Sequence, residues 1–287
     1  MSRRLIRFQS RQSACPPCTL AAPENCGMSR SLSNGALSVT FKGHGGIEEV
    51  DFGNDGAGWY LPGVPVADTV LQQGFAVSNG TFGIARNSLE SWNGDVNSLQ
   101  VCGTASTLRY VAETSWGLRF CRSWQLVAGL NVLRAVTTLT NTTSMPLDVL
   151  FADAYDPDPD ITGDGGNFGK LMDVISISVL GSSRSAALAT GPDSGQTVVM
   201  GSNQPAVIVS SGGDFDILQS QALVNFINNP VNAGGAFLDT GMQVGVKVTI
   251  QPSQSYCYDF RQAYGSSTAS ARSAYSQSWT NAPPLVP

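Results

Sequence analysis

The stretch NVLRAVTTLTNTTSMPLDVLFADAYDPDPDITGD, residues 131–164, predicts two long β-strands joined by a turn and followed by an acidic segment. Residues 132–140 are dominated by Val, Leu and Thr, which suit a pleated, half-buried surface. Residues 141–146 (NTTSMP) have the composition of a turn. On the returning strand, one face would carry Leu147, Val149, Phe151, Asp153 and Tyr155. We expect the remaining strands to pack against this hairpin.

The rest of the chain consists mainly of short alternating runs separated by glycine-rich turns. Asn79-Gly80 between two such runs is a strong hairpin signal. Residues 214–228 are the best helical candidate, and residues 267–279 could form a short terminal helix. The sequence predicts an all-β fold, a large antiparallel β-sandwich over residues 31–262, either as one domain or as two β subdomains divided near residue 165. An extended cysteine-containing arm (1–30) would precede it, and a short C-terminal helix or tail (263–287) would follow it.

The charge pattern limits the partners of the chain. Charged residues make up 13% of the 287 residues, the formal net charge is −5, and Lys42, Lys170 and Lys247 are the only lysines. A nucleic-acid surface needs a basic stripe, so we expect no nucleic-acid partner. No stretch approaches the roughly 20 apolar residues of a membrane span, so we expect none.

Six cysteines are the disulfide candidates: Cys15, Cys18, Cys26, Cys102, Cys121 and Cys257. Disulfides persist in oxidising surroundings, yet no apolar segment follows the charged start, so we expect no signal peptide. A chain made in the cytoplasm that leaves the cell inside a particle would satisfy both observations. Cys102 and Cys121 fall on neighbouring predicted strands, where they could pair or remain two buried thiols. Three of these cysteines, Cys15, Cys18 and Cys26, could also bind zinc with His44, but their spacing is irregular.

The acidic segment is a candidate cation site. Asp156, Asp158, Asp160 and Asp164 supply hard oxygen ligands that can hold calcium, a candidate cofactor. The segment departs from the EF-hand pattern at Ile161, where glycine is needed, and it lacks the glutamate at the twelfth position. Its prolines also favour an extended backbone. The alternatives are a solvated acidic loop and a surface for an arginine-bearing neighbour.

Residues for catalysis are scarce. His44 is the only histidine, and no serine lies in a Gly-x-Ser-x-Gly motif, so we assign no catalytic residue and expect no enzyme. A glycosidase needs only two carboxylates, and the glutamates that inspection leaves open are Glu48, Glu49, Glu90 and Glu113. Side chains that could stack on a sugar, or lie in the core, are Trp59, Tyr60, Trp92, Trp116 and Trp124.

Two segments carry a resemblance to known proteins. Residues 132–160 and residues 244–271 (VGVKVTIQPSQSYCYDFRQAYGSSTASA) resemble paired strands in β-sandwich structural proteins of tailed-phage virions and bacterial surface proteins. The resemblance implies a β-sandwich and no activity.

These observations together suggest a structural component of a large extracellular assembly. We expect a tailed-bacteriophage virion protein of the neck, tail, baseplate or capsid surface, in a virion or extracellular location. Its partners would be copies of itself and other virion or assembly proteins, held by subunit contacts and disulfides. The alternative is a carbohydrate-binding β-sandwich module with a glycan partner, or a carbohydrate-active enzyme.

Overall fold

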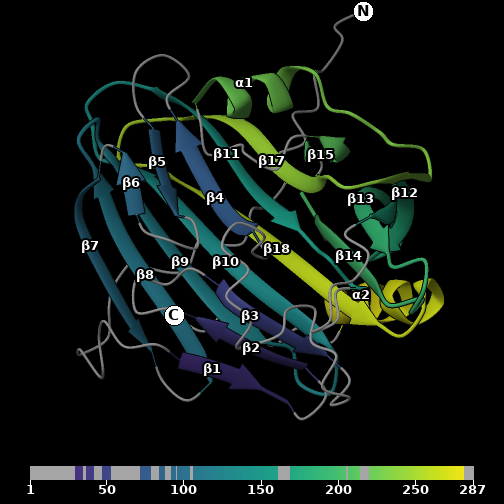
Figure 1. The fold of residues 1–287 in the computed structure, drawn as a ribbon. Helices are drawn as coiled ribbons and strands as arrows, with labels where there is room; N and C mark the ends of the chain where they lie inside the picture. The colour runs from purple at the N-terminus through teal and green to yellow at the C-terminus, as the bar shows by residue number, and fades with distance from the viewer. Residues whose placement is uncertain are drawn as a thin grey trace, which may run out of the picture.

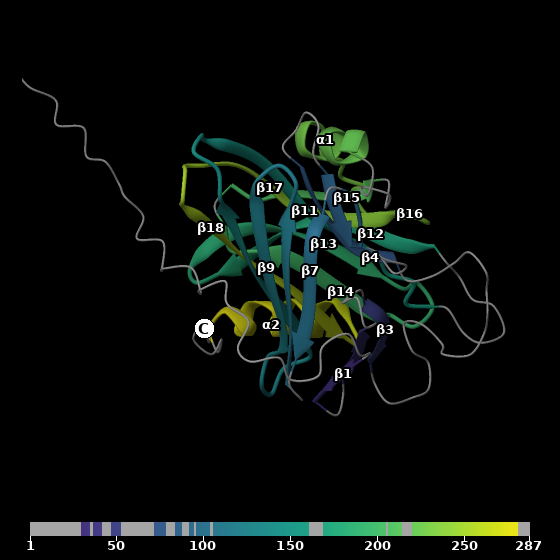
Figure 2. The same cartoon turned by 90° about the vertical axis from the view of Figure 1, so that its left-hand side faces the viewer.

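The computed structural model describes residues 30–34, 37–41, 47–52, 72–78, 84–87, 92–94, 96–103, 106–160, 169–204, 206–213 and 220–280. Within these ranges the chain is mostly antiparallel β-structure, with two large sheets, one small sheet and two helices. The two large sheets form a sandwich, as Figures 1 and 2 show. The predicted sandwich fold is confirmed at this level, whereas most of the N-terminal arm lies outside the described residues.

The largest sheet has nine strands, and segments far apart in the sequence lie side by side in it. Its order is β16 (Ala236–Leu238), β12 (Lys170–Val179), β13 (Ser182–Thr190), β14 (Thr197–Ser202), β18 (Ser255–Gly265), β10 (Val132–Asn141), β9 (Leu118–Leu126), β8 (Thr107–Thr114) and β7 (Val96–Gly103). Strands from before and after residue 165 are therefore hydrogen-bonded into one sheet.

The opposing sheet has six strands. Its order is β15 (Ile208–Gly213), β17 (Gly241–Ile250), β11 (Leu147–Asp156), β4 (Gln72–Ser78), β5 (Ile84–Asn87) and β6 (Trp92–Gly94). A separate three-stranded sheet, which we call the small sheet, consists of β1 (Arg30–Ser33), β2 (Leu37–Phe41) and β3 (Ile47–Phe52). The small sheet, purple in Figure 1, lies against the inner face of the nine-stranded sheet.

Both strands predicted within residues 131–164 form, but they do not make a hairpin. β10 pairs with β9 and β18 in one sheet, whereas β11 pairs with β17 and β4 in the other. The buried Asn141 holds the corner, because its Nδ2 donates to the carbonyl oxygens of Met145 (2.7 Å) and Ile250 (2.9 Å). Its Oδ1 accepts from the backbone N–H of Thr143 at 2.8 Å. The turn chemistry is therefore as predicted, but it carries the chain between sheets.

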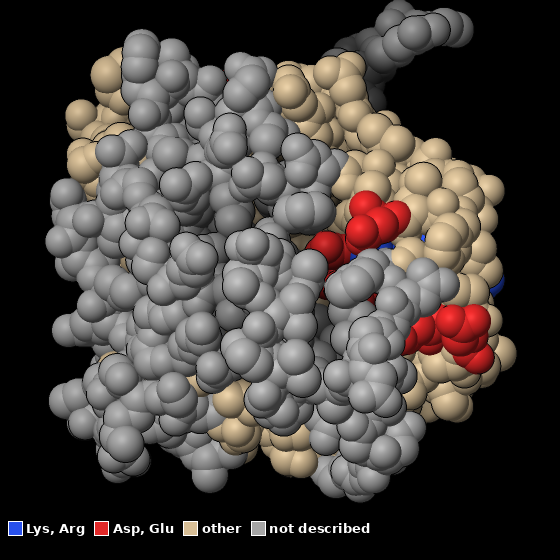
Figure 3. Space-filling view, in the orientation of Figure 1, with Lys and Arg blue, Asp and Glu red and all other residues tan. Residues whose placement is uncertain are grey.

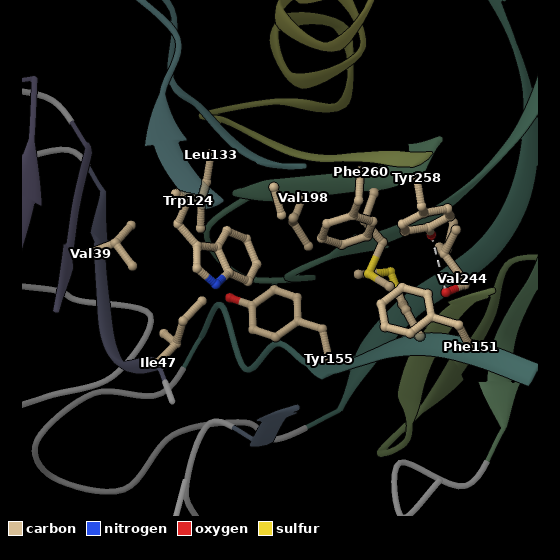
Figure 4. Close-up of a cluster of buried hydrophobic side chains, with 14 of the residues drawn as sticks. Val39, Ile47, Trp124, Leu133, Phe151, Tyr155, Val198, Val244, Tyr258 and Phe260 are labelled. Carbon is tan, nitrogen blue, oxygen red and sulfur yellow. Dashed lines mark hydrogen bonds between the residues drawn. The ribbon is translucent and has the colours of Figure 1, made fainter. Parts of the chain in front are cut away.

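The main core lies between the two large sheets and beneath the small sheet. The predicted face of β11 is its inner face, where Val149, Phe151, Asp153 and Tyr155 are buried. The ring centroid of Phe151 lies 5.9 Å from that of Phe120 and 5.1 Å from that of Tyr258, so aromatic side chains of the two sheets interlock (Figure 4).

A helix packs on the outer face of each large sheet (Figure 1). α1 (Ser220–Asn228) covers part of the six-stranded sheet, and α2 (Thr268–Thr280) covers part of the nine-stranded sheet. α2 is fixed by Arg261, whose guanidinium carbon lies 3.6 Å from the Trp279 ring centroid and whose Nη1 donates to the Ser278 carbonyl. The predicted C-terminal helix is thus confirmed. No helix in the described part of the chain is both long and apolar enough to cross a membrane.

Candidate functional site

Four charged side chains gather at one edge of the sandwich. Asp156 ends β11, Asp158 follows it, Lys170 begins β12 and Asp239 follows β16; we call these four residues the acidic cluster. Lys170 Nζ donates to Asp158 Oδ1 at 2.8 Å and to Asp156 Oδ1, and it lies 3.7 Å from Asp239 Oδ1. In the space-filling view, acidic side chains form two groups on the described part of this face (Figure 3). The strands of both large sheets thus bring three carboxylates to one ammonium group.

The members of the acidic cluster differ in exposure. The side chain of Lys170 is fully buried, and those of Asp156 and Asp158 are 11% and 6% exposed, whereas that of Asp239 is 65% exposed. Burial, followed by the charge of Asp156, raises the pKa of Asp158 to about 7. Burial lowers the pKa of Lys170, but the charges of Asp156 and Asp158 outweigh it and leave that pKa raised. Lys170 is therefore a charged partner, and Asp158 can exchange a proton near neutral pH.

The structure brings together only part of the predicted cation site. Asp156 and Asp158 meet, and the carboxylate oxygens of these two residues and Asp239 lie within 4.8 Å of one another. Asp160 turns away, since its carboxylate accepts from the backbone N–H groups of Asp193 (2.9 Å) and Ser194 (3.0 Å). Asp164 lies outside the described residues. Lys170 supplies positive charge to two of the four predicted ligands, and calcium binding stays a prediction.

A second set of polar side chains is buried in the core between the two large sheets. We call Trp124 (β9), Tyr155 (β11), Gln262 and Tyr264 (both β18) the interior polar group; each is at most 2% exposed. The Tyr264 hydroxyl lies 3.5 Å from that of Tyr155 and 3.4 Å from Gln262 Oε1. Burial raises the pKa of Tyr155, and so do Tyr264 and the charges of Asp158 and Asp156. Tyr155 immediately precedes Asp156 on β11, so the two sets adjoin along the backbone of this strand.

Two N–H donors of the interior polar group lack acceptors. Within the described structure, Trp124 Nε1 and Gln262 Nε2 have no hydrogen-bond partner. In Figure 4 the indole nitrogen of Trp124 points toward the Tyr155 hydroxyl, with Val39 and Ile47 of the small sheet nearby. Buried donors of this kind are rare in native proteins and need an explanation.

A second ion pair lies deeper in the core. Arg122 of β9 and Asp153 of β11 join the two large sheets, and both side chains are at most 1% exposed. The Arg122 guanidinium carbon lies 4.2 Å from the Trp124 ring centroid. Burial raises the pKa of Asp153 to about 6, although Arg122 opposes that shift. We assign this pair to the interior of the fold.

The described cysteines do not pair as expected. The expectation that Cys102 and Cys121 lie on neighbouring strands is wrong, because β8 lies between β7 and β9. Cys121 and Cys257 are likewise two strands apart, since both are register partners of Thr138. Two strand spacings are about 9–10 Å, beyond the roughly 7 Å between Cα atoms that a disulfide tolerates. None of these three cysteines is free, and the other disulfide candidates, Cys15, Cys18 and Cys26, lie outside the described residues.

The other carbohydrate candidates lie elsewhere. Glu113 pairs with Arg119 at 2.5 Å on the surface, and Trp116 packs against the core. The structure does not describe the side chains of Glu48, Glu49 and Trp92. Outside the described residues are also the candidates Glu90, Trp59 and Tyr60 and the predicted zinc ligands Cys15, Cys18, Cys26 and His44.

Sequence reasoning missed Lys170 and Asp239. Lys170 offered a signal, because it precedes Met172 and Val174 on the inner face of an apolar strand, where a charge needs a buried partner. Asp239 offered none, because it joins the acidic cluster only through the pairing of β16 with β12.

Comparison with known proteins identifies the fold. No family model matches the chain, and no curated protein matches its sequence. A bacterial glucoamylase complexed with acarbose matches 91% of this chain with a TM-score of 0.52 and 13% sequence identity, and the chain spans 37% of that protein. A putative aldose 1-epimerase from Escherichia coli K12 matches 83% of this chain and 99% of its own length, with a TM-score of 0.46 and 12% identity. A polysaccharide lyase matches 84% of this chain and 34% of its own, with a TM-score of 0.48 and 13% identity.

The similarity to the glucoamylase corrects two expectations. The resemblance to tailed-phage and bacterial surface proteins is wrong, because the fold is similar to that of part of a bacterial glucoamylase. The assignment as a virion structural component is overturned by the same finding. The misleading strand signals are properties of β-sandwiches in general, since alternation and turn residues do not report what a sandwich binds.

Proposed function

We propose that this chain is a carbohydrate-binding β-sandwich domain that holds its ligand at the acidic cluster. The fold supports the proposal, since the glucoamylase that it resembles over 91% of its length is a carbohydrate-active protein in complex with acarbose. The acidic surface and the scarcity of lysine are compatible with a neutral, hydroxyl-rich ligand and unsuited to a polyanion.

The observation that carries the proposal is the exposed carboxylate of Asp239 beside a buried charge network. Asp239 is 65% exposed and lies 3.7 Å from the ammonium nitrogen of Lys170, beyond direct hydrogen-bond distance. A sugar hydroxyl can donate to this carboxylate, and hydrogen bonds to charged acceptors are about twice as strong as neutral ones. The buried members of the cluster hold Lys170 in place, so the charge pattern that a ligand meets is preorganised.

We propose binding without turnover. Glycoside hydrolysis requires two carboxyl groups that face one bound sugar, about 5–10 Å apart. Asp156 and Asp158 are nearly buried and bonded to Lys170, which leaves Asp239 as the exposed carboxylate of the cluster. A single accessible carboxylate supports recognition better than acid–base chemistry at a glycosidic bond.

Calorimetric titration of the full chain with acarbose and with maltotriose tests the binding. We expect saturable binding by the wild type and an affinity about tenfold weaker for Asp239→Asn, because the substitution removes a charged acceptor and keeps its shape. Asp193→Asn is the matched control, since Asp193 is an exposed aspartate outside the cluster, and it should bind like the wild type. Absence of binding to both saccharides, or equal affinities for Asp239→Asn and the wild type, would contradict the proposal.

Incubation with maltotriose and a panel of p-nitrophenyl glycosides tests the absence of turnover. We expect no product above the buffer background. Product release by the wild type that disappears in Asp158→Asn would instead make the cluster catalytic.

The expected self-association and the expected extracellular location of the protein stay predictions.

A further inference from the structure

We propose that the small sheet is a lid over an inner saccharide subsite formed by the interior polar group. The inference rests on the proposed function and extends the same site inward from the acidic cluster. The inner subsite would bind neutral sugar hydroxyl and ring oxygens through the unpaired donors of Trp124 and Gln262. The lid would have to shift before a ligand could reach them.

The unpaired donors are the first observation behind this inference. Trp124 Nε1 and Gln262 Nε2 lack acceptors in the described structure, and both side chains are at most 2% exposed. Sugar hydroxyl and ring oxygens are acceptors, so a saccharide could satisfy both donors. The hydroxyls of Tyr155 and Tyr264 add two groups that can both donate and accept. Aromatic rings with a few convergent polar groups are the usual composition of a small-molecule site.

The position of the lid is the second observation. Two aromatic residues of the small sheet cover aromatic residues of the interior polar group: the Phe41 and Trp124 ring centroids lie 5.9 Å apart, and those of Phe52 and Tyr264 lie 6.4 Å apart. Phe41 and Phe52 therefore occupy space beside the rings on which a sugar could stack. In Figure 4, Val39 and Ile47 lie on the same side of Trp124 as its nitrogen.

The connectivity of the small sheet permits a shift. Its strands pair only with one another, and no ladder joins them to either large sheet in the described residues. One side-chain bond that holds it to its surroundings runs from Asn34 Nδ2 to the Leu130 carbonyl oxygen at 2.7 Å. Full detachment would expose its buried residues Leu32, Leu37, Val39, Phe41, Ile47, Val50 and Phe52. We therefore expect a displacement at Phe41 and Phe52 with most of the small sheet still attached.

Two substitutions separate the lid from the subsite. Phe41→Ala removes the cover from Trp124 and should bind maltotriose about threefold more tightly, because less contact is lost on opening. Gln262→Leu keeps the volume but removes the donor, and it should bind about tenfold more weakly. It also removes the Oε1 acceptor 3.4 Å from the Tyr264 hydroxyl, so its melting temperature should fall slightly while the fold is retained. Phe226→Ala truncates a buried phenylalanine of the six-stranded sheet's outer cluster and should leave affinity unchanged.

Hydrogen exchange of the wild-type full chain provides a readout that needs no variant. With saturating acarbose or maltotriose, amides of β2 and β3 should exchange at least twice as fast, whereas those of β18 near Gln262 should be protected. Binding that leaves exchange in β2 and β3 unchanged, with wild-type affinity in Gln262→Leu, would overturn the lid and keep the proposed function. Absence of binding to either saccharide would overturn both. If Phe41→Ala fails to fold, Gln262→Leu and the exchange experiment still decide the inference.

Discussion

Arg122 and Asp153 form an ion pair across the interior of the sandwich, with 2.6 Å between Arg122 Nη2 and Asp153 Oδ1. Arg122 belongs to the nine-stranded sheet and Asp153 to the six-stranded sheet, so the pair fixes how the two sheets face each other. Arg122 Nη1 also donates to Thr137 Oγ1 at 3.3 Å. Breaking such a pair leaves one buried charge without compensation, which is far more costly than replacing both partners.

Asp153→Ala should therefore lower the free energy of unfolding by about 3–5 kcal/mol. The double substitution Arg122→Met/Asp153→Leu should recover most of that loss, because it removes both charges and fills the space with apolar groups. Urea denaturation followed by circular dichroism measures both values. Equal stability of Asp153→Ala and the wild type would show that the pair does not hold the sheets.

The pKa of Asp158 predicts a pH dependence of stability. Its folded-state pKa is raised from 3.8 to about 7, so the folded protein takes up a proton at higher pH than the unfolded chain. The stabilising contribution of this group is fully present below about pH 4 and is lost as the pH rises through about 7. The difference in unfolding free energy between the wild type and Asp158→Asn should thus shift in favour of the wild type as the pH falls from 7 to 5. Urea midpoints across this range test it, and a difference that is constant with pH would count against it.

Alanine should lower the stability of the protein more at Gly117 than at Gly129. Its φ is +87°, and a Cβ there would overlap the Cγ2 atom of Thr143. Thr143 cannot rotate freely, since its hydroxyl bonds to Asn141 Oδ1 at 2.8 Å. Gly117→Ala should cost about 2–4 kcal/mol from left-handed strain and overlap, whereas Gly129→Ala, with a φ of +71° and open space around it, should cost about 1–2 kcal/mol. Thermal denaturation compares the two, and equal losses would refute the overlap.

Lysine should be a poor substitute for Arg261, which lies beneath α2. Its planar guanidinium stacks on Trp279 and also bonds to Asp259, with 3.2 Å between Arg261 Nη2 and Asp259 Oδ2. Arg261→Lys should destabilise the protein by about 1–2 kcal/mol, because an ammonium group cannot do both. Arg272→Lys changes an exposed arginine of α2 and should have little effect. Matching melting temperatures for the two variants would argue against the stacking role.

The sandwich could be predicted because alternation is a local property. Phe151 and Tyr155 alternate with smaller residues along β11, and that pattern predicts the inner face on which they lie. The residues that alternate with them are buried too, because α1 covers the outer face, which the alternation does not predict. The separation of β10 and β11 into different sheets could not be predicted, because the same turn residues serve a hairpin and a corner. Their partners, β18 and β17, lie about a hundred residues later in the sequence.

The acidic cluster was only partly visible for the same reason. Asp156 and Asp158 stood out as neighbours in the sequence, but Asp239 reaches them through long-range strand pairing. Two of the predicted cation ligands, Asp156 and Asp158, form ion pairs with Lys170, and no local sequence pattern predicts this pairing. The pairing of Arg122 with Asp153 was more accessible, because each charge lies on an otherwise apolar strand face and needs an opposite charge.

A saccharide that binds at the acidic cluster should change the amide chemical shifts of the residues around it, which titration with maltotriose can map. The largest shifts should fall on residues 170–172 and 236–239 and should saturate with the affinity measured by calorimetry. Asp239→Asn should weaken that saturation about tenfold. Shifts confined to other surfaces, such as α2, or no saturable shifts at all, would contradict binding at the acidic cluster.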